Sequence, residues 1–180
     1  DIKDSVESII SKNENYIKDI NEKNSILKNY FYQNRLKNIF LWADEPEKNI
    51  SRTSNYAVIL FKVYFRDIYI TNIPEETARD AGVIKDLIHI YVCDIFNDAI
   101  TFQMEHNQIV SIVNTKSDIE TIEDDVNEIV QKLVMEDDYV YFTVVYSQVY
   151  DNSSYLHEAY ETNLEMLRYR KLKNKTQVIS

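Results

Sequence analysis

The chain has 180 residues but a single glycine, Gly82, and this scarcity limits what it can build. Phosphate-binding loops need several glycines, because only glycine lets the backbone approach a phosphate closely and adopt positive φ. With one glycine, the chain cannot contain a G-x-G-x-x-G fingerprint, a Walker loop or a G-x-S-x-G elbow. We therefore expect no catalytic residues, no cofactor and no metal site.

Composition and charge narrow the possibilities further. Hydrophobic residues make up 44% of the chain, enough for a core, and the longest apolar stretches are too short to span a bilayer. The net charge of −10 argues against gripping nucleic acid by its phosphates. Basic residues cluster at 168–175, which we interpret as a solvated helix end, with a DNA contact as the alternative.

Two single residues bear on the cellular location of the chain and on its processing. Cys93 is the only cysteine, so an intramolecular disulfide cannot form and a reducing, cytoplasmic location is expected. Asp1 is not a natural start, and we expect a fragment or a processed chain.

The first segment, from Asp1 to about Trp42, contains neither glycine nor proline and is predicted to be one long helix. Its apolar residues recur at alternating steps of four and three, which is a heptad seam. We favour a parallel coiled coil that joins two copies of the chain; a single amphipathic helix packed on its own domain is the alternative. The seam consists of Ile2, Val6, Ile9, Asn13, Tyr16, Ile20 and Leu27, and Lys23, Tyr30 and Asn34 complete the series. Apolar residues crowd at 36–42, as if the helix docks there on the rest of the chain.

The remainder alternates between strand and helix patterns. The predicted elements are strands at 55–70, 99–105, 108–114, 139–150 and 176–179, and helices at 74–97, 117–135 and 154–171. The first of these strands is apolar on both faces, as in a central strand that is covered on both sides. The order predicts an α+β fold, in which a long N-terminal helix precedes a ferredoxin-like β-α-β-β-α-β body with an extra C-terminal helix and strand. We divide the chain at 1–50 and 51–180.

Three groups of residues invite a chemical interpretation, and each has a plainer one. His89 and Cys93 lie four apart on a predicted helix and so share a face, as in a nucleophilic pair or half of a metal site. A third ligand cannot be named, and ordinary helix packing is favoured. The acidic residues at 120–128 suit a solvated helix face better than a cation site, because an EF-hand glycine is absent. The 14 tyrosines suit a core or an interface better than base stacking.

Four segments resemble a known family. They read LKNYFYQNRLKNIFLW (27–42), YAVILFKVYF (56–65), ITFQMEHNQIVSIV (100–113) and SSYLHEAYETNLEMLRYRKLKNKTQVIS (153–180). Together they resemble the degenerate GGDEF-like domain, with its preceding helix, of AraC/YesN-type bacterial transcription regulators. The last segment is the most specific. In that family a helix-turn-helix DNA-binding domain would follow Ser180.

The resemblance implies the fold of a cyclase without its activity. A catalytic GGDEF domain makes cyclic di-GMP and needs carboxylates on its first strand and in its hairpin to hold two cations. Here Lys62 and Tyr64 stand on that strand, and Asn107 stands where a glycine is needed. A pocket that such a domain retains could still bind a small ligand through Glu105, His106 and Gln108.

The resemblance also implies a role and its partners. It points to a non-catalytic relay and dimerisation module of a transcription regulator, with an upstream sensor or receiver domain and with DNA bound only through a domain outside this chain. We expect no membrane contact from this segment. Two alternatives remain: a stand-alone acidic inhibitor that imitates DNA, and a residual nucleotide-binding domain.

Overall fold

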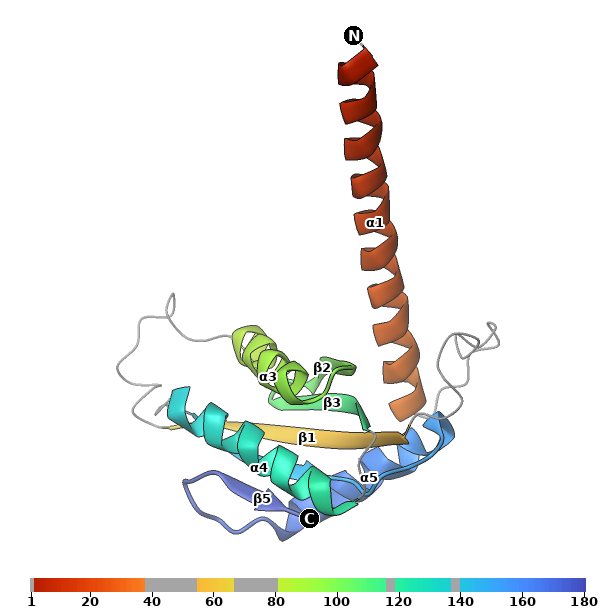
Figure 1. Cartoon of the computed structure of the whole chain (residues 1–180). Helices are drawn as coiled ribbons and strands as arrows, with labels where there is room; N and C mark the ends of the chain where they lie inside the picture. Colours follow the sequence, from red (N-terminus) through yellow and green to blue (C-terminus); the bar gives the residue numbers. More distant parts are fainter. Residues whose placement is uncertain (1, 38–54, 67–80, 116–118, 137–139) are drawn as a thin grey trace.

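The computed structural model describes residues 2–37, 55–66, 81–115, 119–136 and 140–180 (Figure 1). A long helix, α1 (Ile2–Leu36), stands on a body built around one sheet. The strands are β1 (Asn55–Phe65), β2 (Ala99–Glu105), β3 (Gln108–Thr115), β4 (Val140–Tyr146) and β5 (Gln177–Ile179). The body helices are α3 (Ala81–Ile95), α4 (Ile119–Glu136) and α5 (Leu156–Met166), the last flanked by 3-10 turns at Ser153–Tyr155 and Leu167–Tyr169.

The five-stranded sheet has the order β2-β3-β1-β4-β5. The central strand β1 pairs antiparallel with both neighbours, so that Ile59 lies opposite Ser111 of β3 and Tyr146 of β4. β5 adds to β4 in parallel. The helices α3 and α4 connect the strands of a β-α-β-β-α-β unit, and α5 leads to β5. The predicted fold class is confirmed.

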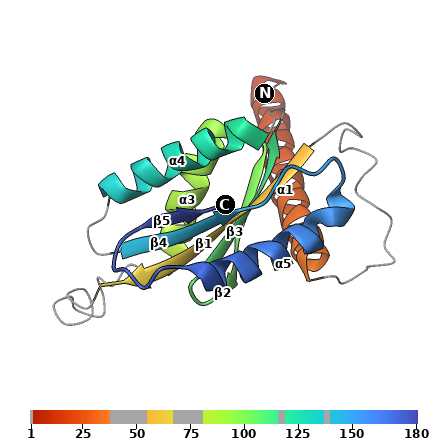
Figure 2. The same ribbon diagram turned by 90° about the horizontal axis from the view of Figure 1, so that it is seen from below.

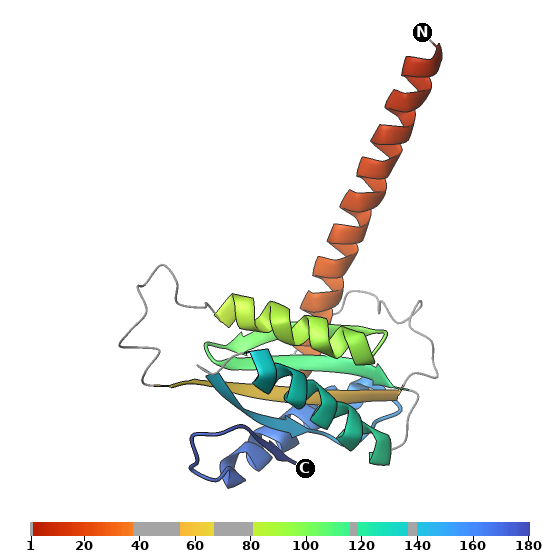
Figure 3. The same ribbon diagram turned by 60° about the vertical axis from the view of Figure 1, so that its left-hand side comes forward.

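Both faces of β1 are buried because helices cover the sheet on both sides (Figures 2 and 3). Alternate residues of a strand point to opposite faces. Ile59 and Phe61 belong to the core beneath α3 and α4, whereas Val58 and Leu60 belong to the core beneath α5 and the end of α1. The doubly apolar pattern of this strand therefore follows from its central position.

The helices α3 and α4 bury one stripe each against the first core. Ile84 and Ile88 of α3 and Val126 and Ile129 of α4 are almost wholly buried, as their helical spacing predicts. Fully burying one such side chain contributes roughly 1.5–3 kcal/mol. These stripes hold the two helices on the face of the sheet opposite α5.

α1 rises from the body and meets it only through its C-terminal turns (Figure 3). Tyr32 and Leu36 are buried in the second core. One turn earlier, Lys28 Nζ lies 2.9 Å from Asp98 Oδ1, just before β2. Asn34 is also buried in the body, so its prediction as the last seam residue is wrong: contacts within the chain already cover it. The docking expected for 36–42 holds for Leu36, and the residues beyond 37 lie outside the described part.

Several elements were predicted to extend too far. The strand predicted at 139–150 ends at Tyr146, because the Ser147 hydroxyl accepts the backbone N–H of Val58 at 3.0 Å and so replaces a ladder bond. Tyr150 forms only an isolated bridge with Tyr56. The helix predicted at 74–97 ends at Ile95, and its first residues lie outside the described part.

The C-terminal elements also differ at their ends. The helix predicted at 154–171 begins as a 3-10 turn at Ser153–Tyr155, which the Asn152 side chain caps by accepting the Ser154 N–H at 2.8 Å, and α5 itself begins at Leu156. Its helical turns end at Tyr169. Thr176 is not part of β5, because its hydroxyl accepts the N–H of Phe142 at 3.1 Å.

Candidate functional site

The candidate site is the end of the sheet where β1 finishes beside the β2–β3 hairpin. Glu105 and Gln108 are paired across a two-residue turn made by His106 and Asn107, so the tight hairpin expected there is confirmed. The N–H of Val63 donates to the carbonyl oxygen of Asn107 at 2.9 Å and fixes the turn against β1. Asn is one of the few non-glycine residues that suit such a turn.

Lys62 lies in the middle of this end of the sheet. It is half-buried and stands opposite Gln108 on β3 and Thr143 on β4. Its neighbours Leu60 and Tyr64 lie on the α5 side of the sheet, since Leu60 is in the second core and Tyr64 contacts Arg170. Alternation therefore places the Lys62 side chain on that same side.

Two of the three predicted ligand residues come together. Gln108 is buried, and its Oε1 accepts the Tyr160 hydroxyl at 3.5 Å. Burial raises the pKa of Tyr160, and the charges of Glu105 and Glu161 raise it further. His106 is exposed in the turn, where its carbonyl oxygen accepts Gln103 Nε2 at 2.8 Å. Ligand binding by these residues stays a prediction.

An aromatic and cationic stack occupies the same end and was missed from the sequence. The rings of Tyr64 and Tyr141 are stacked with centroids 5.0 Å apart. The Arg170 guanidinium lies 3.9 Å from the centre of the Tyr64 ring, and that of Arg66 lies 6.0 Å from the centre of the Tyr141 ring. The cross-strand pairing of two aromatic residues was the only signal available, because Arg170 is remote in sequence.

The residues at this end do not fit the two cations of cyclase chemistry. An ammonium at Lys62 repels a metal ion, and the Tyr64 ring is engaged in the stack. Among the residues that the structure describes, no group of three or more His, Cys, Asp or Glu could hold a metal ion. We derive no catalytic step through a metal here.

His89 and Cys93 do share a face of α3. Cys93 Sγ lies 3.6 Å from His89 Nδ1, and the same nitrogen lies 3.2 Å from Thr101 Oγ1. Burial raises the pKa of the Cys93 thiol, and the charges of Asp94 and Asp98 add to the effect. A reactive cysteine needs a lowered pKa, so this pair has the opposite electrostatics to an activated nucleophile.

The acidic face of α4 is a solvated surface where it is described. Glu123, Asp124 and Glu128 are exposed. Glu128 Oε1 lies 3.1 Å from Lys132 Nζ one turn later. Burial raises the pKa of the Asp125 carboxyl, with further contributions from Glu128 and Asp124. Two of the tyrosines expected to pack in the sheet, Tyr141 and Tyr146, are buried in β4.

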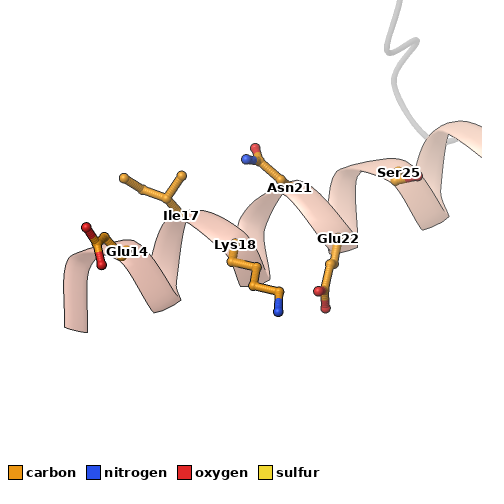
Figure 4. Close-up of a pocket in the computed structure, with 6 residues that line it drawn as sticks. All are labelled: Glu14, Ile17, Lys18, Asn21, Glu22 and Ser25. Carbon is orange, nitrogen blue, oxygen red and sulfur yellow. The ribbon is translucent and has the colours of Figure 1, made fainter. Parts of the chain in front are cut away.

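A shallow hollow lies far from these groups, on α1 (Figure 4). It is lined by Glu14, Ile17, Lys18, Asn21, Glu22 and Ser25. All six belong to one helix, whereas ligand sites are concave and use convergent groups. We interpret this hollow as open helix surface.

Comparisons with known proteins returned little beyond the fold. No protein-family model matches the chain, and no curated protein matches it. Among solved structures, the chain is similar to the diguanylate cyclase SiaD of Pseudomonas aeruginosa, solved in complex with its activator SiaC. The TM-score is 0.47 at 10% identity, over 96% of this chain and 71% of that one. This likeness assigns no activity to the chain.

The helices were also compared with the requirements of a membrane-spanning segment. In the part of the chain that the structure describes, none combines the length and the apolar character that crossing a membrane requires.

Proposed function

We propose that the chain is a non-catalytic relay and dimerisation module, with a GGDEF-like body, of a bacterial transcription regulator of the AraC/YesN type. The observation that carries the proposal is the two-sided character of α1. At about 100° per residue, Tyr32 and Leu36 lie on the side of the helix opposite Ile20 and Leu27. The first pair is buried in the body and the second pair is exposed.

The exposed side has the composition of an interface. Tyr16, Ile20 and Leu27 are 65%, 57% and 63% exposed. Ile10 and Ile17, which sequence analysis left out of the seam, are exposed beside them and widen the apolar face. Exposed apolar side chains that gather on one side of a helix mark an interaction site. A second copy of α1 fits it, because identical heptad seams are self-complementary in parallel.

The non-catalytic part of the proposal rests on the end of β1. Lys62 lies between Gln108 and Thr143, and Tyr64 is stacked on Tyr141. Neither side chain supplies the carboxylate that a cyclase needs at this place. In this proposal the body acts as a rigid connection between α1, which follows the upstream domain, and the DNA-binding domain that would follow Ser180.

Sedimentation equilibrium tests the dimer. The wild type is expected to dimerise, and the double variant Ile9→Asp/Ile20→Asp is expected to be monomeric, because it places like charges in an apolar seam. The matched control is Ser25→Asp, which adds a carboxylate at an exposed position on the opposite side of α1. It should leave the dimer intact. A wild type that stays monomeric at ~100 µM, weaker than about 5 kcal/mol of association, would remove the basis of the relay.

The regulator context has a separate test. The natural open reading frame should continue beyond Ser180 into a helix-turn-helix domain. A frame that stops there would favour the acidic inhibitor instead.

A further inference from the structure

One helix touches both the end of α1 and the segment that leads to β5. α5 lies on the face of the sheet opposite α3 and α4 (Figure 2). Leu156 and Ala159 are fully buried in the core that also holds Tyr32 and Leu36 of α1. An 11-residue helix is roughly 16 Å long, so its two ends contact different parts of the chain.

The first end of α5 is bonded to the last turn of α1. His157 Nδ1 lies 2.7 Å from the carbonyl oxygen of Leu36. A carbonyl can only accept, so Nδ1 carries the proton and donates. The last carbonyls of a helix have no partner within it, and His157 satisfies one of them. This hydrogen bond joins the ends of two helices that are 121 residues apart in sequence.

The middle of α5 is bonded to the sheet. Asn163 Nδ2 donates to the carbonyl oxygen of Val58 on β1 at 2.8 Å. The Tyr160 hydroxyl donates to Gln108 beside the hairpin. These bonds hold α5 against the central strand. A displacement of the first end of α5 is therefore passed along the helix and is not absorbed in a loop.

The far end of α5 is tied to β5. Arg170 follows the last helical turn and stacks on Tyr64. The next residue, Lys171, exchanges two hydrogen bonds with the Gln177 side chain, from its N–H to Oε1 at 3.1 Å and from Nε2 to its carbonyl at 2.9 Å. Gln177 is the first residue of β5. The segment after α5 is therefore held at both of its ends.

We propose that α5 transmits the position of α1 to β5, with His157 as the positioning residue at the joint and Arg170 and Gln177 as the attachment at the other end. The inference deepens the proposed function, since it names the route by which a relay would leave the body. Coupling between two sites is a physical claim only where a change at one is measured at the other. Such coupling must also be reciprocal.

Amide hydrogen exchange, read by mass spectrometry on the whole chain, tests the route. His157→Ala removes the donor to Leu36. It should speed exchange in 33–37 by about tenfold, the effect of losing one hydrogen bond of ordinary strength, and it should also speed exchange in 177–179 by at least about threefold. His157→Asn keeps a donor at nearly the same place and should restore both. Thr162→Ala, at an exposed position of the same helix, is the matched control and should change neither.

The reverse direction gives an independent measurement. Arg170→Ala should speed exchange in 33–37 as well as in 177–179. Faster exchange confined to the end that carries the substitution, in either variant, would overturn the proposal. If His157→Ala fails to fold, Arg170→Ala decides the proposal by its effect on exchange in 33–37.

Failure of this inference is distinguishable from failure of the proposed function. The exchange measurement does not require a dimer, and sedimentation of the same samples reports the dimer directly. A dimer without coupled exchange retains the proposed function and removes the route through α5. A monomer with coupled exchange removes the proposed dimerisation and retains the route through α5.

Discussion

Asn163 Nδ2 donates to the carbonyl oxygen of Val58 at 2.8 Å, although Asn163 is fully buried and its Oδ1 has no hydrogen-bond partner. A carboxylate at this place would be buried without a counterion. We expect Asn163→Asp to lower the free energy of unfolding by more than about 3 kcal/mol at neutral pH. Chemical denaturation measures it, and Thr162→Asp, with the same charge at an exposed site, should cost little.

The loss should depend on pH in one direction. Burial would raise the pKa of the new carboxyl in the folded state above its unfolded value. Its neutral form is compatible with the core, so stability is fully retained below the unfolded pKa and is lost as pH rises through the folded pKa. Stability that is equal at pH 4 and pH 7, relative to the wild type, would show that water reaches the Asn163 site.

The chain should not convert GTP to cyclic di-GMP. Lys62 repels the cation that such a reaction needs, and the Tyr64 ring is engaged by both Arg170 and Tyr141. Incubation with GTP and magnesium or manganese, followed by chromatography, checks this beside an active cyclase. Product that forms only when metal is present would overturn the proposal that the chain is non-catalytic.

Cys93 should be a slow thiol. Burial, then Asp94 and Asp98, raise its pKa, so the thiolate fraction is small at neutral pH and grows only at higher pH. The pH midpoint of the iodoacetamide rate should lie above that of a free model thiol. Asp94→Asn should move this midpoint down, whereas Asp151→Asn, at an exposed loop position, should not. A wild-type midpoint below that of the model thiol would contradict the electrostatic reading of the site.

The chain alone should bind duplex DNA weakly. The net charge is −10, and phosphate attraction is confined to the basic residues at 168–175. Fluorescence anisotropy at ~150 mM salt should give a Kd weaker than about 1 µM, where specific binders typically reach nanomolar values. Submicromolar binding that is lost in Lys171→Glu/Lys173→Glu would instead assign this segment as a DNA contact.

The body of the fold was predictable because its signals are local. The tight turn at His106 and Asn107 separated β2 from β3, and the double apolar face of β1 placed it in the centre of the sheet. Helical spacing identified Ile84 and Ile88 as core residues. These patterns depend on residues only a few positions apart, so one sequence contains them.

The candidate site was less predictable because its contacts are remote in sequence. The stack of Arg170 on Tyr64 joins the end of the chain to the central strand. The end of β4 depends on one hydroxyl, that of Ser147, reaching the N–H of Val58 across 89 positions. Neither contact has a periodic signature, and both require the fold to be known first.

The shortest strand of the sheet has a consequence for the behaviour of the protein in concentrated solution. All seven residues of β4 are buried, and β5 pairs with it only through Thr143, Val144 and Val145. Unpaired strand edges are templates for aggregation. The three residues Gln177–Ile179 therefore cover a mostly apolar edge, and removing them should make the domain prone to form intermolecular sheets.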